Sequence, residues 1–341
     1  MPNGSRINYQ YKFTHNTSQK NFDTAFEGLL TAIAGLKPNA IGHRFVHGGD
    51  IADQSRFLNT KEIARLKGLL SLAPLHMSHN LFGVEYLAKH FTVPQVACFD
   101  TAFHSTLPEL AWRLPIPNIY KLRKYGFHGI NYSHIAKELP KFIGEIAMRH
   151  IVVAHLGSGS SLCLMNNLKS IDTSMGLTPA GGIPMATRSG DLDPGLLLEL
   201  AKLNNQEQLE DLVYHQMGLL ALSNNESSDV SKLVKSKSLN AKFAIEYFAN
   251  QVRGVIGEYA AKAGGIDGIV FTGGIGEHSS IIRSLICDPM KFLGFSLDPN
   301  ANNTNSTFLS EATSKPILMI PADEEIEIFR LVSEYLTSQH L

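Results

Sequence analysis

Residues 152–161 read VVAHLGSGSS, and this stretch decides how the rest of the chain is interpreted. Its β-branched apolar run predicts a buried strand, and the small residues after Leu156 predict a loop. Glycines let backbone N–H groups approach a phosphate, and serine hydroxyls add donors. The loop is not a Walker A motif, because no Gly-Lys-Ser/Thr follows, and Leu162 replaces the last glycine of GxGxxG. A phosphate loop and a tight hairpin turn are equally good interpretations of this stretch alone.

A second stretch, residues 270–280, repeats the pattern with the letters VFTGGIGEHSS. It predicts a strand, a glycine loop and a helix start near His278, whose N-terminus can face an anion. Two such units favour a nucleotide site, and the alternative is two ordinary strand-to-helix turns. A Rossmann-type NAD enzyme is disfavoured, because Asp172 opens DTSMG instead of ending a second strand.

Strands and helices alternate along the chain, which predicts an α/β protein. We expect strands over 7–13, 40–47, 96–99, 162–165, 268–272 and 317–320, with another beginning at Ile151. We expect helices over 21–36, 58–73, 79–91, 131–139, 194–204, 206–216, 240–264 and 279–286, and one from Glu324 that packs back on the first domain. Each half needs its own sheet, so the ligand site is expected in a cleft between two domains.

The composition bounds the function of the 341-residue chain. A hydrophobic content of 44% is enough for a substantial core, and a formal net charge of -1 provides no field for nucleic acid or an anionic membrane. Cys98, Cys163 and Cys287 lie far apart in apolar surroundings and are expected to be reduced, buried thiols. No apolar run is long enough to span a membrane, and the first residues lack a signal peptide's apolar core. We expect a cytoplasmic protein.

Two arginines and an acidic cluster are candidates for binding anions and cations. Arg44 lies in an apolar strand and needs an anionic partner or a cleft; the alternative is a buried ion pair. Arg188 precedes Asp191 and Asp193, and its alternative is a local arginine–aspartate pair that stabilises a loop. Carboxylates at 323–325 follow a strand and suit a magnesium ion, or else they cap a helix.

The histidines are ambiguous from the residues alone. His104 follows a predicted strand end and His128 lies in YGFHG, but a lone histidine is usually structural. His43 and His47 are four residues apart in a predicted strand, so a helical zinc pair is disfavoured.

Taken together, the chain resembles the acetokinase family, that of the acetate kinases, over nearly its whole length. The motifs that carry the resemblance are, in order, GHRFVHGG (42–49), APLH (73–76), FDTAFHSTLP (99–108), YGFHG (125–129), HLGSGSS (155–161), DTSMGLTP (172–179), TRSGDLDPG (187–195), GLLALS (218–223), VFTGGIGEHSS (270–280) and IPADEE (320–325). The resemblance implies the two-domain actin-like ATPase and sugar kinase fold (ribonuclease H-like), closing on ATP, and a homodimer. It also implies an N-terminal domain over 1–102 plus about 325–341, shortened at its start, and a nucleotide-binding domain over 103–324.

The resemblance implies a role for each matching residue. The catalytic residues would be Arg44, Asp100, His128 and Arg188, and Glu324 would be associated with Mg²⁺ or Mn²⁺. ATP or ADP would be bound by His155, Leu156, Gly157, Ser158, Gly159, Asp229, Gly274, Ile275, Gly276, Glu277 and His278. The substrate pocket would consist of Arg44, Val46, Leu75, Phe127 and Pro179.

The implied reaction is reversible, Mg-dependent transfer of the γ-phosphoryl group of ATP to acetate, giving acetyl phosphate and ADP. Arginine forks suit it, because they bind carboxylate and phosphoryl oxygens bidentately. A small apolar pocket selects short acids weakly, so a propionate or short-chain acid kinase is an alternative.

The sequence departs from the family pattern at several positions. We find no match to the family's N-terminal Asn-Ala-Gly-Ser-Ser-Ser-Leu-Lys loop, and a few tens of residues are expected to be absent from this chain. Ser158 and His278 replace asparagines, and Ser231 stands where an arginine is usual. A second hypothesis is therefore a catalytically impaired relative that binds nucleotide or a partner.

Overall fold

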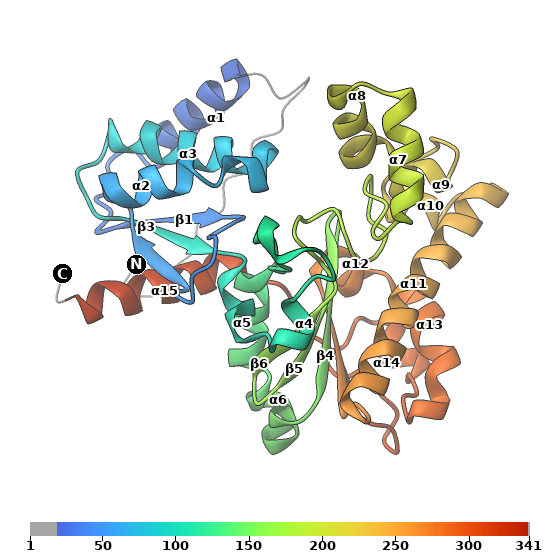
Figure 1. The fold of residues 1–341 in the computed structure, drawn as a ribbon. Helices are drawn as coiled ribbons and strands as arrows, with labels where there is room; N and C mark the ends of the chain where they lie inside the picture. The colour runs from blue at the N-terminus through green and yellow to red at the C-terminus, as the bar shows by residue number, and fades with distance from the viewer. Residues whose placement is uncertain (1–18, 340–341) are drawn as a thin grey trace.

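The computed structural model describes residues 19–339, which form two β-sheets, each with helices on both sides (Figure 1). The first sheet has the order β1-β3-β2. Its strands are β1 (Ile41–Phe45), β2 (Ser55–Phe57) and β3 (Gln95–Phe99), with β1 parallel and β2 antiparallel to β3. The parallel register places Arg44 opposite Cys98, so that the carboxyl ends of β1 and β3 lie together.

Strand β3 shows why this sheet is buried on both faces. Its side chains alternate, as they must in a strand. Ala97 and Phe99 pack in a core cluster with residues of α3 (Pro74–Ala88), whereas Val96 and Cys98 pack in a cluster with residues of α15 (Glu324–Ser338). An apolar strand without polar alternation is typical of a central parallel strand.

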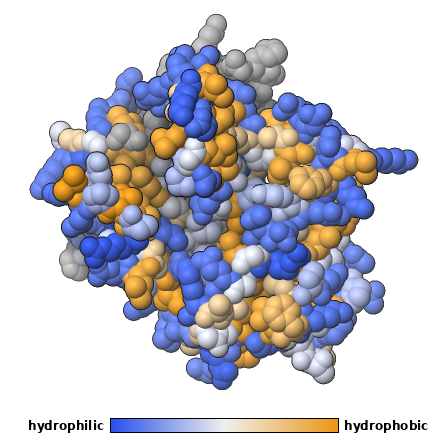
Figure 2. Space-filling model, turned by 45° about the vertical axis from the view of Figure 1, so that its right-hand side comes forward, coloured by the Kyte–Doolittle hydropathy of each residue, from blue (hydrophilic) through white to orange (hydrophobic). Residues whose placement is uncertain are grey.

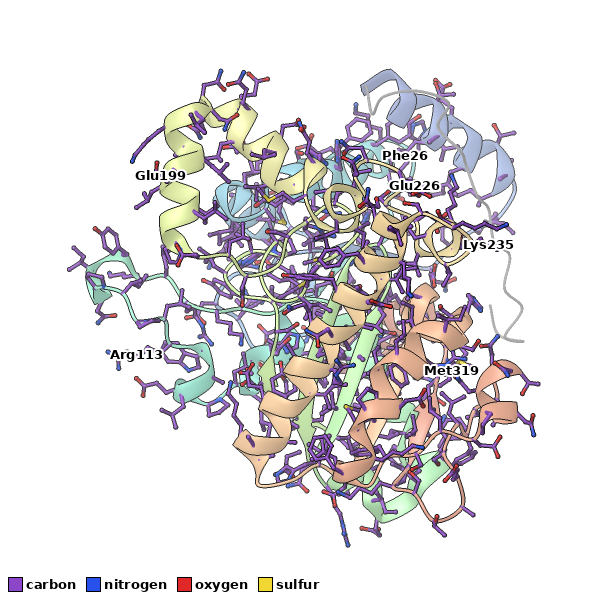
Figure 3. All side chains as sticks on the ribbon, turned by 90° about the vertical axis from the view of Figure 1, so that its right-hand side faces the viewer. Phe26, Arg113, Glu199, Glu226, Lys235 and Met319 are labelled. Atoms are coloured by element: carbon purple, nitrogen blue, oxygen red, sulfur yellow. The ribbon has the colours of Figure 1, made fainter. Side chains whose placement is uncertain are left out.

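The second sheet has the order β6-β5-β4-β7-β8. An antiparallel meander of β4 (Ile151–Leu156), β5 (Ser160–Asn166) and β6 (Lys169–Thr173) is followed by β7 (Gly268–Thr272) and β8 (Ile317–Met319), which extend it with parallel pairs. Val152, Ala154 and Leu156 pack in the cluster that contains α11 (Leu239–Ala263), and Ile151 and Val153 pack on the opposite face. Figure 3 looks onto α11 as it runs along this sheet.

Shorter elements complete the described residues. The remaining α-helices are α1 (Gln19–Ala32), α2 (Thr60–Lys67), α4 (Glu109–Trp112), α5 (Gly129–Glu138), α6 (Pro140–Ile143), α7 (Pro194–Leu203), α8 (Gln206–Asp211), α9 (Gly218–Leu222), α10 (Val230–Leu233), α12 (Gly273–His278), α13 (Ser280–Cys287) and α14 (Pro299–Asn303). Single-turn 3₁₀ segments cover Leu70–Leu72, Ala102–Thr106, Asn118–Tyr120, Gly144–Met148 and Asp288–Leu293, and a π-turn covers Leu212–Gln216. On the face drawn in Figure 2, hydrophobic side chains form small groups among hydrophilic ones.

The structure confirms the α/β class and most of the predicted elements. The strand predicted over 268–272 is β7, and the predicted final helix is α15, which packs on the first sheet and on α5. The helix predicted over 58–73 is wrong, because α2 ends at Lys67 before Gly68, and α3 begins at Pro74 instead of residue 79. Proline is favoured in the first turn of a helix, where its missing N–H is not needed. The helix predicted over 206–216 divides into α8 and the π-turn.

Further expectations concern the first strand, the domain bounds and the cysteines. The strand predicted over 7–13 lies outside the described residues, and the domain bounds at 102 and 324 stay a prediction. The three cysteines are buried and free, as expected. Within residues 19–339, every helix is too short or too polar to cross a membrane.

The contact between α5 and the end of β3 depends on a glycine. Gly129 N donates to Asp100 O at 2.8 Å, and a Cβ at Gly129 would lie 2.1 Å from that oxygen. We predict that Gly129→Ala lowers the free energy of unfolding by about 1–3 kcal/mol, because the backbones must separate.

The matched control is Gly254→Ala in α11, where an added Cβ meets nothing within 4 Å. This variant should gain about 0.5–1 kcal/mol from helix propensity. Urea unfolding of the full chain measures both values, and a neutral Gly129→Ala would contradict the close contact.

Candidate active site

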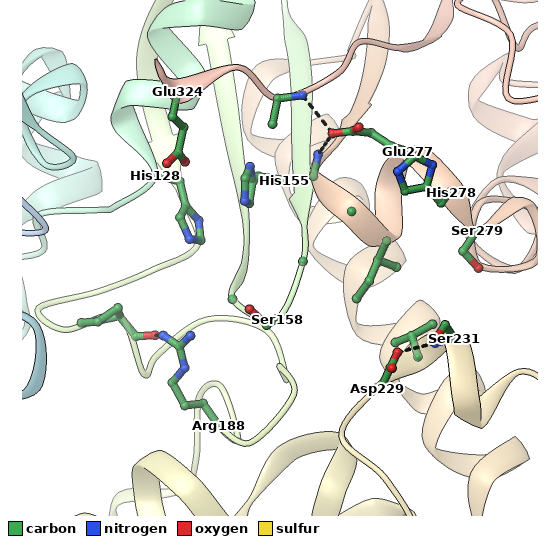
Figure 4. Close-up of a pocket in the computed structure, with 18 of the residues that line it drawn as sticks. His128, His155, Ser158, Arg188, Asp229, Ser231, Glu277, His278, Ser279 and Glu324 are labelled. Atoms are coloured by element: carbon green, nitrogen blue, oxygen red, sulfur yellow. Dashed lines mark hydrogen bonds between the residues drawn. The ribbon is translucent and has the colours of Figure 1, made fainter. Parts of the chain in front are cut away.

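A cavity of about 940 Å³ lies between the two sheets, and its walls come from both. Figure 4 shows His128 and His155 beside each other on one side, Arg188 below them, and Asp229 and Ser231 across the space. The cavity therefore collects segments that are far apart in sequence, as expected for a ligand site between domains.

The turn between β4 and β5 forms part of the cavity wall. β4 ends at Leu156 and β5 begins at Ser160, so this segment is a tight hairpin, closed by the Gly157 N–H donating to Gly159 O at 3.1 Å. The same three residues, Gly157, Ser158 and Gly159, line the cavity. A Cβ at Gly159 would lie 2.9 Å from Arg188 Nη2, so the glycine leaves space for the guanidinium beside the turn. The hairpin and the phosphate-loop interpretations are thus compatible.

The second glycine stretch begins α12 directly after β7. Gly273 has a φ of 78°, and a Cβ there would lie 2.8 Å from Leu156 O, so α12 starts against the end of β4. Glu277 Oε1 accepts hydrogen bonds from Gly273 N and Ala322 N, both at 2.9 Å (Figure 4). Glu277 therefore binds the two chain segments that follow β7 and β8 to each other.

Arg283 is a residue that the sequence interpretation missed. Its side chain is fully buried, and it donates to Gly276 O at 2.7 Å, Glu277 O at 3.0 Å and Asn302 Oδ1 at 2.7 Å. Desolvation lowers its pKa to about 10. The guanidinium fixes the C-terminal carbonyls of α12. The signal in the sequence is a cation within the apolar run IIRSLIC.

Arg44, Asp100 and Glu324 form an ion-pair cluster at the edge of the cavity. Arg44 Nη2 donates to Asp100 Oδ2 at 2.6 Å, and Arg44 Nε lies 3.5 Å from Glu324 Oε2. Asp100 is 1% exposed, and its Oδ1 is buried without a hydrogen-bond partner among the described residues. The Asp100 charge raises the pKa of Arg44, whereas burial raises the pKa of Glu324 to about 7. Arg44 therefore forms an ion pair, which was its alternative interpretation, and it also lines the cavity together with Asp100 and Glu324.

Arg188 does not form the local ion pair with a neighbouring aspartate that was its alternative interpretation. Its Nη1 donates to the carbonyl oxygen of Pro179 at 2.7 Å, and no ion pair with a carboxylate is found for it among residues 19–339. Asp191 accepts from Gly182 N at 2.8 Å, and Asp193 caps α7. The local arginine–aspartate pair is therefore wrong. Burial lowers the pKa of Arg188, as expected for a cation without a neighbouring anion.

The described histidines divide into cavity and structural groups. The rings of His128 and His155 stack with centroids 4.3 Å apart, and burial lowers the pKa of both. His104 is structural: its Nε2 donates to Phe127 O at 2.9 Å. His76, which no candidate role covered, also lines the cavity, and its pKa is lowered to about 4 by burial and then by Arg188.

The proposed acid pocket and nucleotide pocket occupy different parts of the cavity. Val46, Phe127 and Pro179 line it, Pro179 in direct contact with Arg188, and Leu75 lies in the first turn of α3. The nucleotide candidates that line it are His155, Gly157, Ser158, Gly159, Asp229, Gly274, Ile275, Glu277 and His278; Leu156 and Gly276 are buried behind the wall. Ser231, which stands where the family usually has an arginine, also lines the cavity, and lining residues that the sequence interpretation missed include Val230, Val234, Lys235 and Ile281.

The carboxylates of Asp100 and Glu324 are oxygen ligands of the kind that a hard cation prefers. Asp100 Oδ1 is a buried acceptor without a partner among the described residues, and Glu324 shares its cavity. No cluster of three or more histidine, cysteine or acidic side chains that could hold a metal occurs between residues 19 and 339. Magnesium usually takes one or two carboxylates and completes its shell with water and phosphate, so this pair fits a phosphate-bound ion.

The fold and the cavity define a class of protein. A meander extended by two parallel strands, a second sheet beside it, and glycine turns at the strand ends between them are the features of the actin-like ATPase and sugar kinase fold.

Comparisons with known proteins identify the family. The family model described as Acetokinase family matches residues 10–330. An acetate kinase of Rhodopseudomonas palustris is 44% identical over 304 residues, which cover 86% of this chain and 76% of the relative. A crystal structure of a propionate kinase from Francisella tularensis superposes with a TM-score of 0.86 at 34% identity, over 94% of this chain and 85% of that one. A crystal structure of an acetate kinase from Porphyromonas gingivalis superposes with a TM-score of 0.83 at 31% identity. The match covers 99% of this chain and 88% of that one. The chain belongs to the acetokinase family.

The buried neutral histidines predict how stability depends on pH. Burial lowers the pKa of His47, His104 and His155 from 6.5 to about 4. Between these values the unfolded chain binds more protons than the folded one, so stability present above pH 6.5 is lost as the pH falls toward 4. Urea unfolding at pH 7 and pH 5 should show a decrease of about 2 kcal/mol for a group such as His104.

The variant His47→Phe removes one of these titrating rings while keeping an aromatic side chain against Tyr125 and Phe127. Its unfolding free energy should change less between pH 7 and pH 5 than that of the native chain. An identical pH dependence would contradict the neutral state of His47.

Proposed function

We propose that the protein catalyses reversible transfer of the γ-phosphoryl group between ATP and acetate, giving acetyl phosphate and ADP. One observation carries the proposal: Arg44 from the first sheet, and Arg188, His128 and the Gly157–Gly159 turn around the second, meet at one cavity. The named relatives include acetate kinases, which supports acetate as the acceptor. The enzyme is then a phosphotransferase with a carboxyl group as acceptor.

The geometry supports a direct in-line transfer. A carboxylate oxygen of acetate attacks the γ-phosphorus, the bond to the β–γ bridging oxygen breaks, and ADP leaves with that oxygen. Such a transfer spreads charge over three equatorial oxygens and needs positioning more than covalent chemistry from the protein. Arg188 carries a charge without a carboxylate partner among the described residues, so it is the group best prepared to take up that charge.

Arg44, Asp100 and His128 have distinct proposed tasks. The Arg44 fork is held by Asp100 and orients the acetate carboxylate, and Val46, Phe127 and Pro179 surround the methyl group. His128 donates to the phosphoryl oxygens. Asp100 orients Arg44, and its Oδ1, which has no hydrogen-bond partner among the described residues, would help to hold the divalent cation.

The nucleotide is proposed to extend from the β4–β5 turn toward α10. The turn and the Gly274–His278 segment hold the phosphates, and Asp229 lies at the ribose or adenine end, where its Oδ1 accepts from Ser231 N at 2.8 Å (Figure 4). The apolar side chains of Val230, Val234 and Ile281 give this end the character of a base-binding wall.

A divalent cation, Mg²⁺ or Mn²⁺, fits beside Asp100 and Glu324. When bound, it neutralises charge on the β- and γ-phosphates. The two carboxylates would hold the cation, and Arg44 is paired with Asp100 at 2.6 Å.

We further propose a cytoplasmic homodimer. The three free thiols suit a reducing compartment. Exposed side chains such as Leu110, Leu198 and Leu203 are those that a second copy of the chain would cover.

The first test is acetyl phosphate formation from ATP, magnesium and acetate, trapped with hydroxylamine. We predict that Arg188→Ala lowers kcat by about 10³-fold or more, because a clamp arginine stabilises the charge of the transferring group. The control Arg113→Ala removes an exposed arginine that pairs with Glu109 on α4, and it should keep full activity. A native chain that binds ATP without turnover would instead support the catalytically impaired relative.

The length of the acid is a separate question, because the relatives include a propionate kinase of Citrobacter rodentium at 38% identity. We predict that Val46→Ala, which removes carbon atoms from the cavity wall, raises kcat/KM for propionate relative to acetate by about tenfold, the worth of one methylene. The control is Val84→Ala, a buried change in the same core cluster outside the cavity lining. An unchanged ratio in Val46→Ala would place the methyl pocket elsewhere.

A further inference from the structure

The two stacked histidines each have one ring nitrogen inside the protein and one toward the cavity. A Cβ at Gly157 would lie 3.9 Å from His155 Nε2, and a Cβ at Gly159 would lie 3.3 Å from His128 Nε2. Both Nε2 atoms therefore lie beside the turn that lines the cavity. A neutral imidazole carries its proton on one nitrogen only, so the partner of Nδ1 decides whether Nε2 is a donor or an acceptor.

The inner partner of His155 is an amide. Asn131 Nδ2 lies 2.9 Å from His155 Nδ1 and donates its other hydrogen toward Thr272 Oγ1 at 3.5 Å, leaving Asn131 Oδ1 without a partner among the described residues. In this orientation the amide N–H groups face two acceptors, His155 Nδ1 and Thr272 Oγ1, and the group left unpaired is a carbonyl oxygen. Orphaned buried N–H groups are rarer than under-satisfied carbonyls. His155 Nδ1 is therefore the acceptor, and its proton is on Nε2.

The inner partner of His128 is a short chain of hydroxyl groups. His128 Nδ1 lies 2.9 Å from Ser161 Oγ, which lies 2.6 Å from the hydroxyl of Tyr132. Tyr132 is fully buried, so its O–H must find an acceptor, and within residues 19–339 that acceptor is Ser161 Oγ. Ser161 then has its own hydrogen free to donate to His128 Nδ1, and the proton of His128 is also on Nε2.

We propose that Asn131 and Ser161, with Tyr132 behind Ser161, are positioning residues that hold His155 and His128 as paired Nε2–H tautomers aimed at the transferring phosphoryl group. This inference rests on the proposed function for its target, but the tautomers are a property of the protein alone. The arrangement places two neutral donors beside Arg188 without the repulsion of two stacked imidazolium ions. Burial, which lowers both pKa values, is consistent with neutral rings.

The direct test is ¹⁵N nuclear magnetic resonance of the full chain with labelled histidine, without substrates, at neutral pH. Signals are assigned by their loss in His128→Gln and in His155→Gln. We expect both rings to carry the proton on Nε2. A proton on Nδ1 of either ring in the native chain would overturn the proposal for that ring, whatever the activity.

The variant Asn131→Asp keeps the size of the side chain but offers only acceptors. The proton of His155 should move to Nδ1, the ring then faces the cavity with a lone pair, and kcat should fall about 10²-fold, as for the loss of one transition-state donor, with KM for acetate little changed. Ser161→Ala should release His128 into a mixture of tautomers with a similar loss of kcat.

A matched control separates this effect from general destabilisation. Ser170→Ala removes another buried serine hydroxyl, 2.8 Å from His104 Nδ1, outside the cavity lining. It should lose as much unfolding free energy as Ser161→Ala while keeping kcat. Equal losses of kcat in the two serine variants would reduce Ser161 to a structural role. Absence of turnover in the native chain would instead count against the proposed function, with the tautomers still read from the spectrum.

Discussion

The ion pair between Arg44 and Asp100 is the interaction on which the cavity depends. Arg44 is in β1 and Asp100 follows β3, two parallel strands whose carboxyl ends lie side by side. Backbone hydrogen bonds reinforce the pair, because Asp100 N donates to Phe45 O and Asp100 O accepts from Gly129 N. The charge on Arg44 is thus fixed to the first sheet, to α5 and, through Glu324, to the start of α15. Asp100 is buried while the Arg44 side chain is 39% exposed, and an ion pair of this kind is a weak source of stability but a strong source of orientation.

The second sheet contributes what the first lacks. Its strands β4 and β7 are followed by glycine turns, where an added Cβ would approach another group: Gly159 lies against Arg188, and Gly273 lies against the end of β4. Loops then place charged side chains in the space that these glycines leave open. Arg283 fixes the far side of that space from within the core, where its donors are all used by oxygen acceptors.

Much of this arrangement could be predicted from the sequence, and the parts that could not share a physical cause. The strand over 268–272 and the helix from Glu324 are evident because their apolar periodicity is local. The short strands β2 and β6 are too brief and too polar to show a period, and the partner of β2, strand β3, lies about forty residues further along the chain. Arg188 looked like a loop-stabilising cation, and only the structure shows that both neighbouring aspartates are engaged elsewhere. Asn131 belongs to no motif, and Ser161 belongs to HLGSGSS only as a possible phosphate donor, because the importance of both residues lies in which histidine nitrogen they face.

The lack of a carboxylate beside Arg188, among the described residues, has a consequence for the whole molecule. Among the described residues, the desolvated guanidinium of Arg188 has the carbonyl oxygen of Pro179 as its hydrogen-bond partner, which is a cost to the folded state. An anion that enters the cavity removes that cost. Folding and occupancy are therefore thermodynamically linked. A ligand present at 100 times its dissociation constant adds about 2.7 kcal/mol to the free energy of unfolding. In a cell rich in phosphorylated metabolites, the lifetime of this protein is set in part by the compounds that fill its cavity.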